Sequence, residues 1–304
     1  MHILTRRSFL ETASLLAALG LTSTRAAARQ APAQTSFTPI RRNVGYFTGR
    51  GGTIGWFVSS DAVAVIDSQF PDTAQACVAG LKQKTTRRID LLANTHHHGD
   101  HTGGNAVFRP EVGFIVAHDN VPMLMRRAAQ GSDGAGPGVP DRTYDRVWTH
   151  DLGGERLRLR YYGPAHTSGD SVVTFEQANV VHMGDLMFNR RHPFIDRPAG
   201  ASIANWITVL ETTVKDHAED TIYIFGHARD GAPVTGSRAE LLQMRDYLTA
   251  VLEHVRKGIA AGQSRDAITA SGPLKGFEDY QEAPPLLTLA SVLGVAYDEL
   301  QDNN

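Results

Sequence analysis

Short runs of apolar residues, separated by turn-forming residues, predict β-strands through most of the chain. Residues 53–58 and 62–67 form two such runs around a Ser-Ser-Asp turn. The run 155–161 alternates leucine with arginine, so that strand should have one wet face. We expect the remaining strands at 89–94, 113–117, 144–148, 171–175, 179–185 and 221–227.

Apolar residues spaced three or four apart predict helices between and after these strands. One helix should cover 72–84 and begin at Asp72 as its cap, and another should cover 202–217 with one apolar face. We expect further helices at 118–130, 237–261, 265–270 and 284–300. Strands and helices therefore come in two blocks, each with its strands first, which is typical of a mixed α/β fold.

The first residues indicate an export signal that is not part of the fold. Thr5 to Leu10 carries the pair Arg6-Arg7, an apolar run follows at 13–21, and Ala26 to Ala28 supplies a cleavage site. The apolar run is too short to cross a membrane. We expect residues 1–28 to be a twin-arginine (Tat-like) signal peptide, with a Sec signal as the alternative.

That signal implies the Tat export machinery as a partner. It also implies a mature protein that is periplasmic or secreted and has no membrane anchor after cleavage. Residues 29–42 are polar and contain proline, so they predict a linker before the folded part.

Charge and cysteine content exclude several classes of function. The 30 lysines and arginines nearly balance 32 aspartates and glutamates, which argues against nucleic acid as a partner. The one cysteine, Cys77, can form no internal disulfide and excludes a cysteine-ligated cluster. Since Cys77 falls on an apolar helix face, we expect it in the core.

Histidines and aspartates follow the predicted strands with unusual regularity. The loop from Thr95 to His101 follows the strand 89–94 and holds four histidines and one aspartate within seven residues. His166, Asp185 and His227 follow or end later strands. Because such strand ends converge on one crevice in α/β proteins, we expect these side chains to meet.

Imidazole nitrogen combined with carboxylate oxygen is a donor set that zinc prefers. Three imidazoles would make one open tetrahedral site. An aspartate with two further imidazoles would make a second, and another aspartate could bridge them. In this chain the first site would be formed by His96, His98 and His166. The second would be formed by Asp100, His101 and His227, and Asp185 would be the bridge. Two such ions about 3.5–4 Å apart lower the pKa of bound water to about 7 and polarise a carbonyl or phosphoryl oxygen.

The motif His96-x-His98-x-Asp100-His101, with the three later ligands in that order, resembles the metallo-β-lactamase superfamily over roughly residues 45–231. The resemblance implies an α/β, four-layer αββα sandwich at 43–235, with a helical C-terminal extension at 236–304 packed on it. It assigns the same seven ligands to two zinc ions per chain, with iron or manganese as alternatives. It also implies that Asp100 takes a proton in turnover and that Asp185 is part of the catalytic site.

The activity that the resemblance implies is hydrolysis of a small-molecule substrate, an amide, ester, lactone or thioester, by metal-bound hydroxide. The commonest metallo-β-lactamases carry Cys and Lys where this chain has Asp185 and Phe188, and lactonases of this fold carry Tyr at the second position. Glyoxalase II enzymes share all the ligands, but their basic glutathione site has no evident counterpart here. A β-lactamase, a glyoxalase II-like thioester hydrolase and a non-catalytic metal-binding maturation partner stay open as alternatives.

Several other residues each have two interpretations. Asp67 either caps its strand or orients a metal-bound histidine. Arg190 and Arg191 either clamp an anionic group of the substrate or form a solvated turn paired with Asp196. The loop 131–140, rich in glycine and proline, is either a lid or a plain surface loop. Four further histidines are not expected to be ligands: His97, His118, His182 and His192.

Overall fold

The structure, a computed structural model, describes residues 34–129 and 138–302. The predicted signal peptide at 1–28 lies outside the described residues, as does all but the end of the predicted loop at 131–140. Among the described residues, no helix has the length and apolar character needed to cross a membrane.

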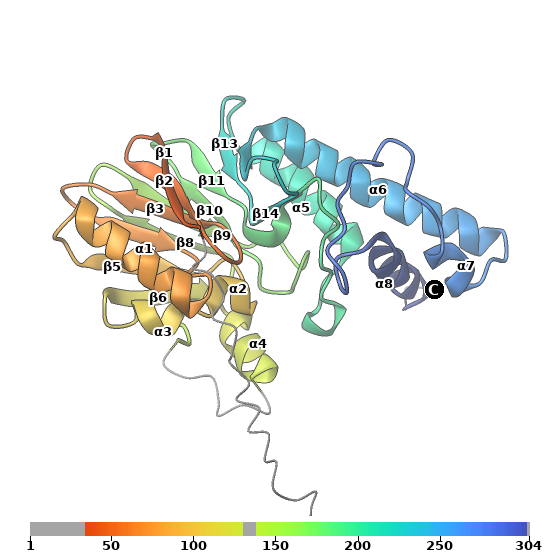
Figure 1. Cartoon of the computed structure of the whole chain (residues 1–304), viewed down its shortest axis with the longest axis horizontal. Helices are drawn as coiled ribbons and strands as arrows, with labels where there is room; N and C mark the ends of the chain where they lie inside the picture. Colours follow the sequence, from red (N-terminus) through yellow and green to blue (C-terminus); the bar gives the residue numbers. More distant parts are fainter. Residues whose placement is uncertain (1–33, 130–137, 303–304) are drawn as a thin grey trace, which may run out of the picture. The chain divides into compact units, whose positions relative to one another are not determined.

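Two β-sheets form the centre of the fold (Figure 1). The first has the order β1-β2-β3-β4-β5-β6-β7, antiparallel from β1 to β4 and parallel from β4 to β7. Its strands are β1 (Ser36–Arg41), β2 (Val44–Thr48), β3 (Ile54–Val58), β4 (Val63–Ile66), β5 (Ile89–Ala93), β6 (Val112–His118) and β7 (Arg142–Tyr144).

The second sheet has the order β15-β13-β11-β10-β9-β8. Its strands are β8 (Val147–Asp151), β9 (Arg156–Arg160), β10 (Val172–Phe175), β11 (Val180–His182), β13 (Ile222–Ile224) and β15 (Thr235–Gly236). A separate parallel pair joins β12 (Phe188–Asn189) to β14 (His227–Ala228). In β9 the leucines are buried and the arginines are not, which confirms the predicted wet face.

Helices cover the outer face of each sheet. On the first sheet lie α1 (Pro71–Lys84) and α3 (Asn105–Phe108), with α4 (Asn120–Ala128) following β6. On the second lie α5 (Ile203–Asp216), α6 (Arg238–Ala260), α7 (Arg265–Thr269) and α8 (Leu289–Asp302). Figure 1 shows α1 and α6 on opposite sides of the sheets, so the αββα sandwich predicted from the resemblance is confirmed.

Three apolar clusters hold these layers together. One fills the space between the sheets, with Phe57 stacked near Phe175. A second lies between α1 and the first sheet and includes Cys77, which is buried as predicted. The third joins α5, α6 and α8, with Trp206 and Tyr247 fully buried in it. The C-terminal helices therefore share one core with α5, because their apolar faces pack on the same side of the second sheet.

Several predicted boundaries were wrong. Residues 36–41 form β1, so the linker predicted at 29–42 does not extend over them. The single strand predicted at 144–148 is interrupted at residues 145–146, where β7 ends and β8 begins. The last helix begins at Leu289 and not at residue 284. Helix α1 begins after Phe70 with proline in its first turn, so Asp72 is not its cap and pairs with Arg50.

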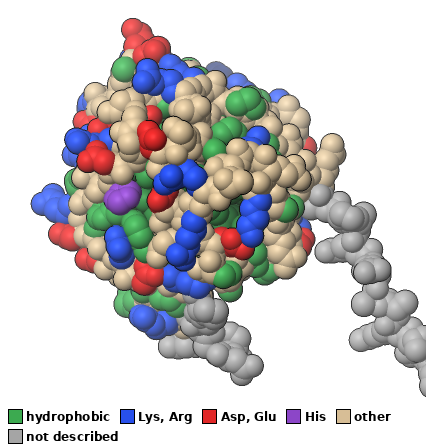
Figure 2. All heavy atoms as spheres, turned by 90° about the vertical axis from the view of Figure 1, so that its left-hand side faces the viewer, with side chains coloured by type: hydrophobic (Ala, Val, Ile, Leu, Met, Phe, Trp, Pro, Cys, Tyr) green, Lys and Arg blue, Asp and Glu red, His purple; other side chains and the backbone are tan. Residues whose placement is uncertain are grey.

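Acidic and basic side chains are mixed over the face drawn in Figure 2, in keeping with the near balance of charge in the sequence. Such a surface has no dominant sign on that face and gives little steering to a highly charged polymer.

Candidate metal centre

The histidine loop is fixed at the carboxyl end of β5. Helix α2 (Gly99–Thr102) begins directly after His98 and carries Asp100 and His101. The start of the loop is held by Asp67, which follows β4 and is fully buried. The Asp67 carboxylate accepts hydrogen bonds from the Thr95 backbone N–H and hydroxyl, both at 2.8 Å. Neighbouring parallel strands thus deliver both the ligands and their support to one edge of the sheet.

The second sheet supplies the other ligands. His166 lies between β9 and β10, Asp185 lies in a 3-10 turn after β11, and His227 opens β14. Gly226 permits the close approach of two of these segments, because a Cβ there would lie 2.1 Å from Asp185 Oδ1. All seven predicted ligands fall into two groups of neighbouring donor atoms.

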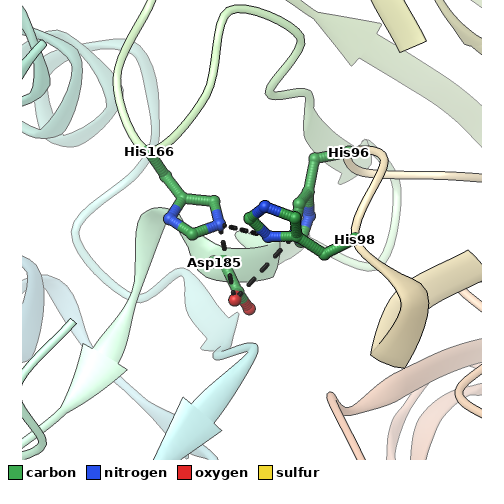
Figure 3. Close-up of side chains that lie close together, drawn as sticks. All are labelled: His96, His98, His166 and Asp185. Carbon is green, nitrogen blue, oxygen red and sulfur yellow. Dashed lines mark hydrogen bonds and ion pairs between the residues drawn. The ribbon is translucent and has the colours of Figure 1, made fainter. Parts of the chain in front are cut away.

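The first group is formed by three imidazoles and Asp185 (Figure 3). His98 Nδ1 lies 3.0 Å from His96 Nε2 and 2.9 Å from His166 Nε2. Asp185 Oδ2 lies 3.9 Å from His96 Nε2 and 3.6 Å from His166 Nε2. These donor atoms converge on one point, which is the arrangement that a single ion needs.

The second group contains Asp100, His101 and His227, with Asp185 beside it. His227 Nε2 lies 3.0 Å from Asp100 Oδ2 and 3.4 Å from His101 Nε2. Asp185 Oδ1 lies 2.9 Å from His101 Nε2 and 3.4 Å from His227 Nε2. Asp185 therefore directs one oxygen to each group, as a bridging ligand must.

Each histidine ring has one nitrogen that points toward the centre and one that points away from it. When the nitrogen that points away donates a hydrogen bond, the other nitrogen of a neutral ring carries a lone pair. The single Thr95 hydroxyl proton goes to Asp67, so Thr95 Oγ1 can only accept from His96 Nδ1, 3.0 Å away. His101 Nδ1 lies 2.7 Å from Asp67 Oδ2 and donates to it. Neutral His96 thus presents an unprotonated Nε2 to the centre, whereas any second proton that His101 takes up lies on its Nε2, which faces the centre.

The same reasoning holds for the other two inner rings. His98 Nε2 donates to Asp196 Oδ2 at 2.9 Å, which leaves its Nδ1 unprotonated. His166 Nδ1 donates to the Phe194 carbonyl at 2.8 Å, which leaves its Nε2 unprotonated. When both rings are neutral, His98 Nδ1 and His166 Nε2 consequently face each other at 2.9 Å with two lone pairs between them. Two facing lone pairs repel each other. A bound cation would remove this repulsion, because both nitrogens could coordinate it.

Burial and neighbouring charges divide the ligands into two electrostatic classes. Burial lowers the pKa of His166 to about 3 and also lowers the pKa of His96. Burial opposes the charged form of His227 too, but Asp185 and Asp100 outweigh it and raise the pKa of His227 to about 9. Burial also raises the pKa of the Asp185 carboxyl, yet His101 and His227 hold that pKa well below its usual range.

A cavity of about 540 Å³ opens over the centre. Four ligands form part of its wall, and the other lining residues come from four segments of the chain. These lining residues are Gly51, Gly99, Phe188, Arg191, Phe194, Leu286 and Leu287. The ligands in the wall are His98, Asp100, Asp185 and His227. The centre is therefore reachable by a small molecule.

The structure decides between the two interpretations of the other polar residues. Asp67 orients His101 and holds Thr95, so it is a support for a ligand. Asp196 does not pair with the arginines and instead faces His98. Arg190 forms an ion pair with Asp279 and is not among the cavity residues, whereas Arg191 is. A clamp of two neighbouring arginines is thus not what the chain forms.

The other histidines lie outside the two ligand groups. His97 Nε2 lies 3.6 Å from Asp196, and the His118 ring stacks on Tyr161. His182 Nε2 lies 3.0 Å from the Thr53 carbonyl, and its Nδ1 accepts from the Gly184 N–H, so His182 supports the turn that carries Asp185. His192 contacts the Tyr247 hydroxyl.

Asp196, Leu286 and Leu287 are parts of the site that the sequence did not predict. Asp196 lies 98 residues from its partner His98, and the leucines precede α8, more than 50 residues after the last ligand. The only sequence signal for Asp196 is its place on the loop that follows Asp185.

Comparison with known proteins supports these observations. The chain is 28% identical over 152 residues to the 2,4-dinitroanisole O-demethylase subunit alpha of Nocardioides sp. (strain JS1661), covering 49% of this chain and 45% of that protein. It is 31% identical over 107 residues to a hydroxyacylglutathione hydrolase of Methylococcus capsulatus, covering 33% of this chain and 35% of that one. The chain thus spans less than half the length of these relatives.

A solved metallo-beta-lactamase from Pontibacter korlensis shares the fold, with a TM-score of 0.59 and 19% identity, covering 71% of this chain and 99% of that one. The family model described as the metallo-beta-lactamase superfamily matches residues 47–252, which include all seven ligands and reach into α6. The chain therefore belongs to the metallo-beta-lactamase superfamily.

Proposed function

We propose that this protein is a metal-dependent hydrolase that binds two divalent ions, zinc foremost, and cleaves a small amide, ester, lactone or thioester. The observation that carries the proposal is the convergence of seven ligand residues beside an open cavity. When bound, two such ions supply a nucleophile from water at neutral pH and polarise the carbonyl of the substrate.

The residues of the chain set the conditions for this chemistry. Asp67 and Asp196 hold the His101 and His98 rings in fixed orientations, so little reorganisation is needed when a substrate enters. Asp100 stands in the cavity wall with a partly exposed carboxylate. Burial raises its pKa, but His101 and His227 outweigh this and lower it to about 2, so Asp100 is ionised at neutral pH.

Two narrower activities stay as alternatives within this proposal. Similarity to a hydroxyacylglutathione hydrolase favours a thioester substrate. The lactamase alternative differs from the commonest enzymes of that class at Phe188, which is buried and stacks on the His227 ring. A non-catalytic metal-binding partner would not need an open cavity beside a complete ligand set.

A panel assay on purified protein of known metal content tests the proposal. The substrates are a chromogenic cephalosporin, a lactone, S-lactoylglutathione and a phosphodiester. We expect turnover of at least one carbonyl substrate that is lost after chelation and returns with zinc. If no substrate is turned over with two ions bound, the hydrolase proposal is wrong and the non-catalytic alternative takes its place.

We further propose that the protein is exported by the Tat machinery, on the basis of Arg6-Arg7 and the apolar run that follows. Replacing both arginines by lysine should leave the uncleaved precursor in the cytoplasm, because the twin-arginine pair is the recognised signal. Fractionation and immunoblotting of the two forms measure this. Unchanged export of the double variant would favour a Sec signal.

A further inference from the structure

We infer that the substrate of this centre carries a carboxylate on an apolar body, in addition to its scissile group, and that Arg191 binds the carboxylate. This inference rests on the proposed function and specifies its substrate class. Three features carry it: the unpaired charge of Arg191, the composition of the facing wall, and the distribution of charge around the metal ligands.

Arg191 is the cationic side chain of the cavity wall. Its Nη1 lies 3.5 Å from the carbonyl of Ala228, the residue after the ligand His227, which places the guanidinium beside the metal centre. Its Nε is buried and makes no hydrogen bond within the described part of the chain. Because Nε is buried, the part of the guanidinium that can face a ligand in the cavity is its terminal nitrogens.

The nearby carboxylates are already engaged elsewhere. Asp279 pairs with Arg190, and Asp230 accepts from Gln281 Nε2 at 2.9 Å. Over the ranges that the structure describes, Arg191 forms no ion pair. The aspartates in the cavity wall, Asp100 and Asp185, are metal ligands whose charge two divalent ions more than neutralise. Arg191 then remains as a positive charge that the protein itself does not balance.

The rest of the wall is apolar and aromatic. The Phe188 ring stacks on His227 with centroids 5.2 Å apart, and the Phe194 ring lies 5.4 Å from His98. Leu286 and Leu287 close the cavity from the segment before α8, and Leu286 is 58% exposed. An exposed leucine at the rim of a polar centre suits contact with an apolar part of a ligand.

A carboxylate fits this arrangement better than a phosphate. The planar guanidinium matches a carboxylate with two parallel hydrogen bonds, and one unpaired cation balances one negative charge. A phosphate dianion would need further donors, and the described lining residues offer no second lysine or arginine. The cavity therefore has three regions for a substrate. The scissile bond would lie at the metal ligands, the carboxylate at Arg191, and the apolar body against the apolar wall.

The test compares two esters that differ only in a terminal charge. Mono-p-nitrophenyl adipate carries a carboxylate, and p-nitrophenyl hexanoate has the same leaving group and a chain of the same length. Zinc-loaded wild type is compared with Arg191→Gln, with Arg191→Lys, and with Arg229→Gln as a matched control. Arg229 is an exposed arginine near the centre that does not line the cavity. Thermal unfolding and metal content confirm that each variant is folded and loaded.

We expect wild type to prefer the adipate ester. Arg191→Gln should lower kcat/KM for it about 10- to 100-fold while changing that for the hexanoate ester less than about threefold. Arg191→Lys should keep part of the preference, because it retains the charge without the planar fork, and Arg229→Gln should keep all of it. Equal loss for both esters in Arg191→Gln, or no preference in wild type, would overturn the inference.

A binding measurement separates this inference from the proposed hydrolase activity. Calorimetry with zinc-loaded protein compares 6-phenylhexanoate with 6-phenylhexanamide. The carboxylate can also coordinate metal, but that contribution is common to wild type and variant, so the change in the ratio of the two affinities reports Arg191 alone. A ratio that falls about tenfold or more in Arg191→Gln supports the anion site even if no ester is hydrolysed. An unchanged ratio contradicts it even if esters are hydrolysed.

Discussion

On one side of Asp185 three imidazoles face one another, whereas on the other side two imidazoles lie beside a second carboxylate. The first group is nearly sealed from solvent except at His98, and burial keeps the pKa of His96 and His166 low. In the second group the carboxylates keep the pKa of His101 and His227 high despite burial.

The difference shows two ways in which a chain can prepare a metal position. In the first group the second nitrogen of each ring is hydrogen-bonded, so uncharged lone pairs converge and repel each other until a cation binds. In the second group, protons shared between His101, His227 and the aspartates occupy the place of the cation. Binding there is an exchange of protons for metal, and it depends on pH in a way that binding to the first group does not.

The largest effect should come from removing His98, because its Nδ1 is the donor nearest to both other imidazoles of the first group. His98→Ala should lower kcat/KM at least about 1,000-fold, or about 4 kcal/mol of transition-state stabilisation, while circular dichroism stays near that of wild type. Activity assays at saturating zinc measure this. Substantial turnover by the folded variant would remove His98 from the site.

Replacing Asp185 should affect the two groups unequally. Asp185 Oδ1 approaches His101 to 2.9 Å, whereas its Oδ2 stays 3.6 Å or more from the first-group nitrogens. Asp185→Ala should therefore lower occupancy of the second position first and leave about one ion per chain. Elemental analysis after gel filtration gives the stoichiometry. Two ions retained per folded chain would contradict the bridging role.

The two supporting aspartates offer a smaller and more selective test. Asp196→Asn should weaken metal binding at the first position, since Asp196 orients His98, and Asp67→Asn should weaken it at the second, since Asp67 orients His101. Loss of such a supporting partner costs about 10–100-fold in metal affinity. Competition titrations with a chelator give both affinities. Equal weakening of both positions by both substitutions would show that the groups are not supported separately.

The ligands could be predicted from the sequence, but Asp196, which orients one of them, could not. The loop at 95–101 packs four ligands into one short segment, and the three later ones sit at the ends of strands, so local patterns were sufficient to find them. Asp196 lies in a loop with neither strand nor helix periodicity, and Leu286 approaches the cavity because α8 packs in the core of α5 and α6. Their roles depend on tertiary packing, which no spacing along the chain encodes.

The smallest and most specific effect is the number of protons released when metal binds. In the metal-free protein the pKa of His227 is raised to about 9, and the pKa of His101 is also raised, so both rings hold a proton at pH 7. Metal must displace these protons. Affinity at the second position should therefore rise with pH, up to about tenfold per pH unit for each proton released, and should level off above about pH 9. His166, with its pKa lowered to about 3, is already unprotonated at pH 7 and contributes no such slope to the first position.

Two variants isolate the positions for this measurement. His227→Ala removes the second position and retains the first, and His166→Ala does the reverse. Calorimetry of zinc binding at pH 7 in buffers of different ionisation enthalpy counts the protons released. We expect up to two protons per ion for His166→Ala, from His101 and His227, and fewer for His227→Ala. Equal proton release by the two variants would mean that the groups do not differ in charge, and that the division of this centre into a neutral and an ionised half is wrong.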